Sequence, residues 1–167
     1  MRLLTLVRHA KSSWDYPELD DFHRPLNDRG RADAPRMAEH VRRSLGPADR
    51  LVTSPAVRAE STARAFAQSQ HIDWSRVVVQ PRIYEASPET LLRIVQLLDD
   101  SDRHVMLFGH NPGLSELAHL LARCSFDDMP TCAVVQLGFD AKAWSDVDER
   151  SGVQRFYACP RQFRQKS

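Results

Sequence analysis

The chain has 167 residues, enough for a single domain that buries its own core without disulfides or a bound metal. Its 23 basic and 22 acidic residues leave a formal net charge of +1, so the overall charge does not predict a nucleic-acid partner. No apolar run approaches the roughly 20 residues that a membrane-spanning helix needs, so no membrane partner is expected either. We therefore expect one domain over residues 1–167.

The cysteines and the two ends of the chain indicate where the protein is expected to work. Cys124, Cys132 and Cys159 show no C-x-x-C spacing, which favours reduced thiols over a disulfide framework or a zinc site. The first apolar run is too short, and too soon interrupted by charge, for a signal peptide. We expect a cytoplasmic protein whose Arg-rich tail, from Arg155 to Lys166, is solvated and partly frayed.

Short apolar runs alternate with helical patterns along the whole chain. In chain order the expected elements are a strand at 3–8, a helix at 28–45, a strand at 50–53, a helix at 55–70, a strand at 77–80, a helix that starts at Ser87-Pro88-Glu89, a strand at 104–109, a helix from Asn111-Pro112-Gly113 to Leu121, a strand at 134–139 and a weaker strand at 153–158. This alternation predicts right-handed crossovers and a mainly parallel sheet. The expected fold is an α/β three-layer sandwich with helices on both faces of the sheet.

Two of the helices carry distinct start signals. Asn27 or Asp28 is available to cap the helix at 28–45, although Pro35 inside it should kink the helix or delay its start. Ser54 followed by Pro55 is the preferred order of N-cap and first helical residue, so we expect Ser54 to cap the helix at 55–70. Arg58 then falls in the first turn of that helix.

Basic and imidazole side chains follow the apolar runs at three places. The run at 3–8 ends in Arg8 and is followed by His9, the run at 104–109 is followed by His110, and Arg58 opens a helix after the run at 50–53. Because open α/β folds bind ligands at the carboxyl edge of the sheet, we expect these four side chains to converge there. Two arginines and two histidines suit a tetrahedral anion and a nucleophilic imidazole better than a metal ion.

With these residues in place, the chain resembles the histidine phosphatase superfamily, also called the phosphoglycerate-mutase-like or branch-1 phosphatases. The resemblance runs from Leu3 to about Leu121. It rests on Arg8-His9-Ala10-Lys11-Ser12-Ser13-Trp14, Thr53-Ser54-Pro55 through Arg58 to Ser61-Thr62-Ala63, Tyr84-Glu85, and Gly109-His110-Asn111. The short length, and the run Asp21-Phe22-His23-Arg24-Pro25-Leu26 followed by Gly30, are similar to the SixA-type phosphohistidine phosphatases.

The resemblance implies a phosphoglycerate-mutase-like fold and a role for each motif residue. It makes His9 the nucleophile that becomes phosphorylated, with Arg8, Arg58 and His110 holding the phosphoryl oxygens. Glu85 falls where many members keep the proton donor to the leaving group, although Glu89 or Asp21 could reach the same pocket. No metal or other cofactor is expected, because positioning and charge stabilisation can supply phosphoryl transfer.

The family pattern is not matched everywhere. Ala10 stands where Gly is usual, and Lys11 and Asp15 stand where the mutase pattern has Glu and Asn. An Asp facing a phosphate would repel it, so we expect Asp15 to point away from the pocket. This disfavours a sugar-phosphate mutase.

Several further residues have both a functional and a structural interpretation. Ser12 and Lys11 could contact phosphate or cap a turn, with Ser12 the favoured contact, and His23 could line the pocket. Trp14 and Tyr16 could form a substrate rim, but packing under a loop is the simpler interpretation. The other histidines are expected mostly at surface or helix-face positions: His40, His71, His104 and His119.

The predicted function is a metal-independent phosphatase that works through a phosphohistidine intermediate, with phosphohistidine in a protein as the favoured substrate. A phosphoramidate leaves readily once its nitrogen is protonated, so a small open site suffices. A phosphatase for a small phosphate ester and a non-catalytic module that binds phospho-groups stay open as alternatives.

Overall fold

The computed structural model describes residues 1–163 and shows one mixed sheet of six strands. The strand order is β3-β2-β4-β1-β5-β6. The strands are β1 (Arg2–Arg8), β2 (Arg50–Thr53), β3 (Val78–Val79), β4 (His104–Gly109), β5 (Val134–Phe139) and β6 (Gly152–Ala158). The four strands from β3 to β1 run parallel, whereas β5 and β6 pair antiparallel. The α/β fold with a mainly parallel sheet is therefore confirmed.

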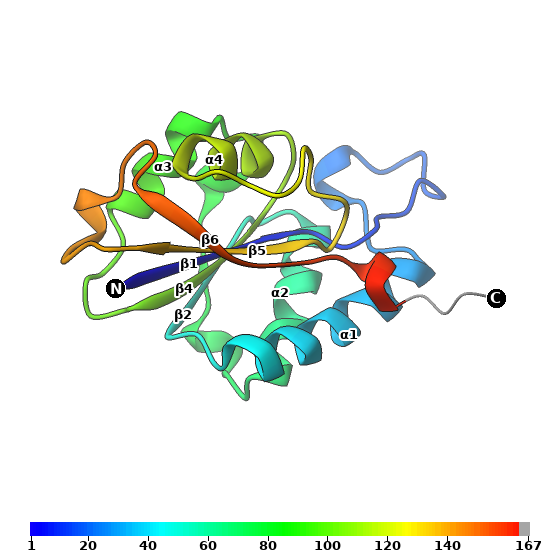
Figure 1. Cartoon of the computed structure of the whole chain (residues 1–167). Helices are drawn as coiled ribbons and strands as arrows, with labels where there is room; N and C mark the ends of the chain where they lie inside the picture. The colour runs from blue at the N-terminus through cyan, green and yellow to red at the C-terminus, as the bar shows by residue number, and fades with distance from the viewer. Residues whose placement is uncertain (164–167) are drawn as a thin grey trace.

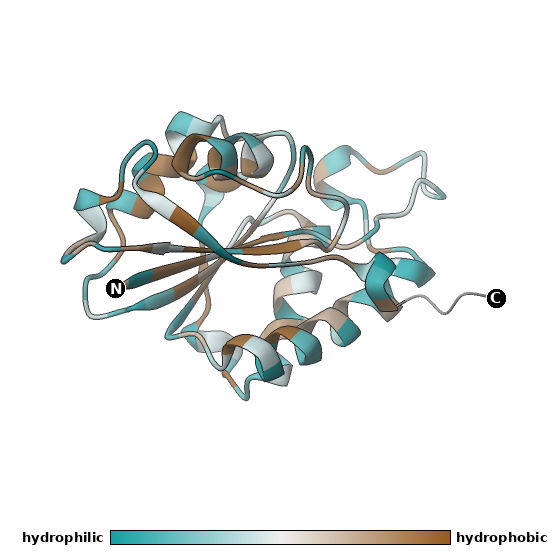
Figure 2. Cartoon of the chain, viewed as in Figure 1, coloured by the Kyte–Doolittle hydropathy of each residue, from teal (hydrophilic) through white to brown (hydrophobic). Residues whose placement is uncertain are grey.

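Four helices cover the two faces of the sheet. They are α1 (Asp28–Leu45), α2 (Val57–Ser69), α3 (Pro88–Gln96) and α4 (Gly113–Leu121). Helices α1 and α2 pack together below the sheet, and α3 and α4 pack together above it (Figure 1). Because the central strands are covered on both faces, their side chains alternate between two cores: Val105 and Leu107 lie in one, Met106 and Phe108 in the other. Figure 2 shows this as largely hydrophobic central strands between helices with hydrophilic outer faces.

Two expectations about helices α1 and α2 are corrected. Pro35 lies inside α1, which still begins at Asp28 after the Asn27 cap, so Pro35 does not delay its start. Ser54 does not cap α2, because that helix begins at Val57 and Ala56 precedes it without a side-chain cap. The Ser54 hydroxyl contacts the ring of His110 instead.

Two expectations about individual positions also change. His104 is buried in β4, where its Nε2 lies 2.7 Å from Thr5 Oγ1 and its Nδ1 lies 3.2 Å from the carbonyl oxygen of Pro47. It therefore belongs to the interior, because neighbouring strands supply its polar partners. Part of the expected tail, residues 155–158, is strand β6, and residues 164–167 lie outside the described residues. Among residues 1–163, no helix is long and apolar enough to cross a membrane.

Candidate active site

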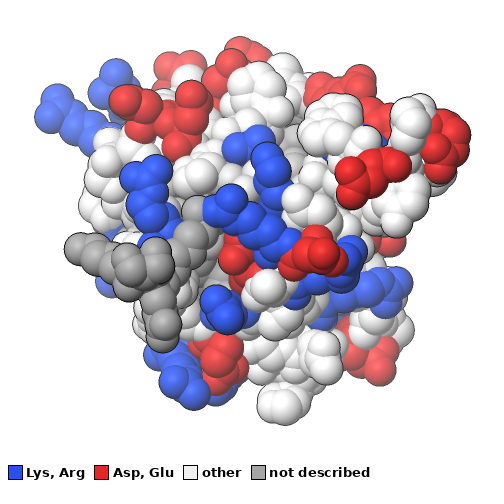
Figure 3. All heavy atoms as spheres, turned by 90° about the vertical axis from the view of Figure 1, so that its right-hand side faces the viewer, with Lys and Arg blue, Asp and Glu red and all other residues white. Residues whose placement is uncertain are grey.

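The parallel strands deliver three polar side chains to one edge of the sheet. His9 follows β1, Ser54 follows β2 and His110 follows β4, and these strands are neighbours in the order β2-β4-β1. A cavity of about 690 Å³ opens at this edge, and its lining includes Arg8, His9, Arg58 and His110. The four predicted residues therefore meet in one pocket. Figure 3 shows Lys and Arg side chains across the middle of this face of the molecule.

His9 is held by its own main chain and by its ring. Its backbone N–H donates to the carbonyl oxygen of Gly109 and its carbonyl accepts from the N–H of Cys132, both at 3.0 Å. Ring Nδ1 lies 2.8 Å from the carbonyl oxygen of Ala10. A carbonyl can only accept, so Nδ1 carries the proton and Nε2 keeps its lone pair.

The surroundings of His9 keep the ring neutral. Burial lowers the pKa of His9 from 6.5 to about 3, and the nearby charges of His110, Arg58 and Arg8 act in the same direction against the hydrogen bond to Ala10. The imidazole is thus unprotonated at Nε2 near pH 7. This is the form that an attacking nucleophile requires.

Arg58 places its guanidinium beside that nitrogen. It is the second residue of α2, as the sequence predicts for the first turn, and its Nε lies 3.4 Å from His9 Nε2. Its other nitrogens donate to the backbone oxygen of Asp21 at 2.6 Å and to the Asp21 carboxylate at 2.8 Å. The start of α2 adds unpaired N–H groups and a dipole that favour an anion.

Arg8 and His110 carry polar atoms that suit an oxyanion. Among residues 1–163, Arg8 Nε and His110 Nδ1 are the buried side-chain nitrogens or oxygens without a hydrogen-bond partner. Arg8 Nη1 donates to the carbonyl oxygen of Met129 at 2.9 Å, which fixes the side chain. Burial, followed by the charge of Arg58, lowers the pKa of His110 from 6.5 to about 4. An oxyanion bound between Arg8 Nε and His110 Nδ1 would accept hydrogen bonds from both nitrogens, which are otherwise costly to bury without a partner.

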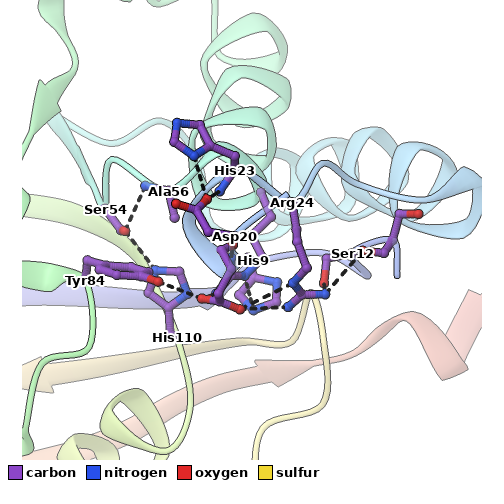
Figure 4. A network of polar contacts seen from close by, with 12 residues as sticks. His9, Ser12, Asp20, His23, Arg24, Ser54, Ala56, Tyr84 and His110 are labelled. Atoms are coloured by element: carbon purple, nitrogen blue, oxygen red, sulfur yellow. Dashed lines mark hydrogen bonds and ion pairs between the residues drawn. The ribbon is translucent and has the colours of Figure 1, made fainter. Parts of the chain in front are cut away.

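Ser54 contributes to the site in a way that the sequence does not reveal. Its Oγ lies 2.8 Å from His110 Nε2 and accepts the N–H of Ala56 at 3.2 Å, as Figure 4 shows. The rings of His110 and His9 are 5.3 Å apart between centroids. The hydroxyl therefore orients the second histidine, whereas the sequence pattern suggests a helix cap.

Asp21 links three sides of the pocket. Its carboxylate accepts from Arg58, from the Tyr84 hydroxyl at 2.7 Å and from Arg24 at 3.1 Å. Partial burial raises the pKa of Asp21, but the hydrogen bonds from Tyr84 and Arg58 outweigh it and hold the pKa at about 2. Burial and the same hydrogen bond raise the pKa of Tyr84 to about 12. Asp21 is thus ionised and acts as a clamp that holds Arg58, Tyr84 and Arg24. It also lines the pocket, as the sequence allows for one of the two alternatives to Glu85 as proton donor.

Glu85 lines the pocket and Glu89 does not. The Glu85 side chain is exposed, and its backbone φ of 57° lies in the left-handed region, which costs about 1–2 kcal/mol for a residue with a side chain. Cys132, which binds the His9 carbonyl, has a similar φ of 61°. His71 and Arg150 adopt the same φ of 57° outside the pocket lining, so this backbone conformation is not specific to the site.

The two predicted substrate contacts have different outcomes. Ser12 lines the pocket, and its hydroxyl accepts from Arg24 Nη1 at 2.8 Å. His23 does not line it, so that expectation is wrong: its exposed ring lies 2.6 Å from Asp20, which holds it on the outside of the loop. Trp14 lines the pocket and is exposed instead of packing under a loop, whereas Asp15 lies outside the lining, as expected.

Comparison with known families identifies this arrangement. The model of the histidine phosphatase superfamily (branch 1) matches residues 4–91, more than half of the chain. The chain belongs to this superfamily. The matched range contains Arg8, His9, Arg58 and Glu85, whereas His110 lies beyond it and is placed in the pocket by the geometry of β4.

Relatives of this histidine phosphatase include proteins of distant organisms. An uncharacterized chloroplastic protein of Arabidopsis thaliana is 32% identical over 160 residues, which cover 90% of this chain and 72% of the relative. A candidate phosphohistidine phosphatase SixA from Agrobacterium tumefaciens is 28% identical, covers 83% of this chain and 92% of its own, and superimposes with a TM-score of 0.74. The structure of the protein histidine phosphatase SixA with tungstate has the same fold, with a TM-score of 0.81 at 20% identity over 97% of this chain and 99% of its own.

Membership of the superfamily supports a phosphatase. Among residues 1–163, no group of three or more His, Cys, Asp or Glu side chains is arranged to hold a metal ion. The pocket does bring together Arg8, Arg58, His9 and His110, a set of side chains that suits the binding and transfer of a phosphoryl group.

Proposed function

We propose that the protein hydrolyses phosphohistidine in a phosphorylated protein, through a phosphorylated His9. The observation that carries this proposal is the unprotonated Nε2 of His9 beside Arg58 in a cationic pocket. An unprotonated nitrogen at this position disfavours a module that only binds phosphate, because an arginine in its place would hold an anion better than a neutral imidazole does. We further propose that it acts in the cytoplasm.

The first half of the reaction transfers the phosphoryl group to the enzyme. His9 Nε2 attacks phosphorus in line with the leaving nitrogen, so the new P–N bond to His9 forms as the P–N bond to the substrate breaks. The electron pair of the broken bond goes to the substrate imidazole, which leaves with its other nitrogen protonated or takes a proton from water. Arg8, Arg58 and His110 stabilise the charge on the three phosphoryl oxygens.

The second half regenerates the free enzyme. Water attacks the phosphorus of phospho-His9, the P–N bond breaks and inorganic phosphate leaves. The electron pair of the broken P–N bond returns to His9 Nε2. Nδ1 keeps its proton because it stays hydrogen-bonded to the Ala10 carbonyl oxygen. The resting tautomer is thus restored without a rotation of the ring.

The acids available in the pocket favour a phosphohistidine substrate over an alkyl ester. An alkoxide leaves slowly unless an acid protonates it, whereas an imidazole departs readily. Asp21 is ionised and held by Arg58 and Tyr84, so it has no proton to give near pH 7. Glu85 is exposed at the rim. Glu116, the other glutamate in the lining, is exposed too, so an alkyl ester would depend on a rim acid such as Glu85, whereas a phosphohistidine would not.

His9→Ala is the direct test. We expect it to abolish release of phosphate from a phosphohistidine protein. It should also abolish the acid-labile phosphate that we expect mass spectrometry to detect on His9 when the wild-type protein is quenched rapidly during turnover. The matched control is His23→Ala, which removes an exposed histidine outside the pocket and should retain activity. Turnover by His9→Ala near the wild-type rate would refute the proposal.

A further inference from the structure

An exposed apolar segment borders the pocket. Residues 14–21, here called the rim loop, are all exposed and connect β1 with the helical region that follows. Three large hydrophobic side chains lie on it: Trp14 is 73% exposed, Tyr16 48% and Leu19 38%. Figure 1 shows the loop projecting from the body of the molecule at the end of β1. Such a group of exposed apolar side chains next to a ligand pocket indicates a surface that is covered in use.

Trp14 is exposed and yet rigidly supported. The guanidinium of Arg24 lies 3.6 Å from the centroid of the indole, so it covers one face of the ring. Arg24 is itself buried and donates to Ser12 Oγ, to the Ser13 carbonyl and to the Asp21 carboxylate. An aromatic ring fixed in this way loses little freedom when a partner covers its other face.

The charge of the rim loop is opposite to that of the pocket beside it. The loop carries four acidic residues and no Lys or Arg. Asp20 pairs with His23 and Asp21 with Arg58, but the carboxylates of Asp15 and Glu18 form no ion pair within residues 1–163. These two charges would repel a small phosphorylated anion and attract a cationic segment. Figure 3 shows acidic side chains along the upper right of the face, next to the basic centre.

We propose that the rim loop is a docking surface for the polypeptide that flanks the phosphohistidine of a protein substrate, and that this polypeptide is basic and apolar. An apolar side chain of the substrate lies on the open face of Trp14, and its Lys or Arg residues face Asp15 and Glu18. The inference rests on the proposed function and deepens it. A free metabolite that fits inside the pocket would leave Tyr16 and Glu18 untouched, since neither lines the pocket.

The test compares three probes: a peptide with a central phosphohistidine flanked by Lys and Leu, a peptide of equal length flanked by Glu and Leu, and phosphoramidate. We expect the wild-type protein to have about tenfold higher kcat/KM for the basic peptide than for the acidic one at low salt. The preference should shrink at high salt, because exposed charges are screened over about 8 Å at physiological ionic strength. It should appear in KM more than in kcat.

Variants assign the preference to the loop. The double change Asp15→Lys with Glu18→Lys should remove or reverse it, and Tyr16→Ala should raise KM for the basic peptide relative to phosphoramidate. The matched control is Glu149→Lys, which should keep the preference. Glu149 is an exposed acid in the connection between β5 and β6. That connection follows Phe139, which pairs with Arg2 at the start of β1, so Glu149 lies toward the opposite end of β1 from His9.

The outcomes separate the two proposals. Equal kcat/KM for the two peptides, or the same change with Glu149→Lys, would overturn the docking surface and leave the phosphatase intact. Hydrolysis of phosphoramidate without either peptide would overturn both the protein substrate and the docking surface. If Tyr16→Ala changes only the oligomeric state, the rim loop mediates contacts between copies of this chain, and the inference is again overturned.

Discussion

Replacing His9 with Asn should make the stability of the protein less dependent on pH. In the folded protein His9 has a pKa of about 3, mainly because it is buried, whereas its ordinary value is 6.5. Between these values the unfolded chain binds a proton that the folded protein does not, so the free energy of unfolding falls as the pH falls. The loss begins near pH 6.5 and is complete only near pH 3.

The magnitude at pH 5 follows from these values. The pH then lies about 1.5 units below the unfolded pKa, and each unit is worth about 1.4 kcal/mol, so His9 lowers the free energy of unfolding by about 2 kcal/mol relative to pH 8. The folded ring carries almost no proton at pH 5, so the unfolded value sets the result. His110, with a pKa of about 4, should contribute a similar amount.

Urea unfolding followed by circular dichroism at pH 8, 7, 6 and 5 measures the effect. The stability of His9→Asn relative to wild type should rise by about 2 kcal/mol between pH 8 and pH 5. Leu97→Ala, a surface change without a titrating group, should run parallel to wild type. Parallel curves for His9→Asn and wild type would refute the inference that His9 is buried and neutral.

Three further predictions concern the pocket and the segments that form it. Arg58→Lys should lower kcat/KM by tenfold or more, about 1.4 kcal/mol, because an ammonium cannot reproduce the planar fork, and equal activity would place Arg58 outside the reaction. Glu85→Gln should slow alkyl phosphate esters by about a hundredfold and phosphohistidine much less, and an equal loss on both would contradict the preference for a phosphoprotein. Gly30→Ala should lower the free energy of unfolding in urea by roughly 2 kcal/mol or more, because the new Cβ would overlap the carbonyl oxygen of Lys11, and unchanged stability would contradict that close approach.

The sequence predicts the strands that end at the pocket because their burial leaves a continuous apolar run. The strand at 104–109 matches β4, and its end places His110 beside His9. Arg58 is equally predictable, because it belongs to a helix start that follows a strand. Residues next to strand ends and helix starts are therefore accessible to local reasoning.

Residues whose partners are distant in sequence are not predictable in this way. The Ser-Pro pair suggests that Ser54 is a helix cap, but its hydroxyl contacts His110, 56 residues later. Asp21 becomes a clamp only because the segment around it folds against α2 and Tyr84. His23 has the same local setting, yet its ring pairs with Asp20 on the outside. The direction of a loop side chain is decided by tertiary contacts that no short pattern records.

The anchoring of His9 has a consequence for how such proteins diversify. Its N–H and carbonyl are bonded to main-chain groups of Gly109 and Cys132, so its position depends little on which side chains surround the strand. Mutations can then accumulate through the core, provided that volume is kept, without displacing the nucleophile. Asp15, Tyr16 and Glu18 of the rim loop do not line the pocket, so they are freer to change than Asp21, which holds Arg58. On the proposed docking role, a few surface substitutions at these positions would redirect the same reaction to other partners.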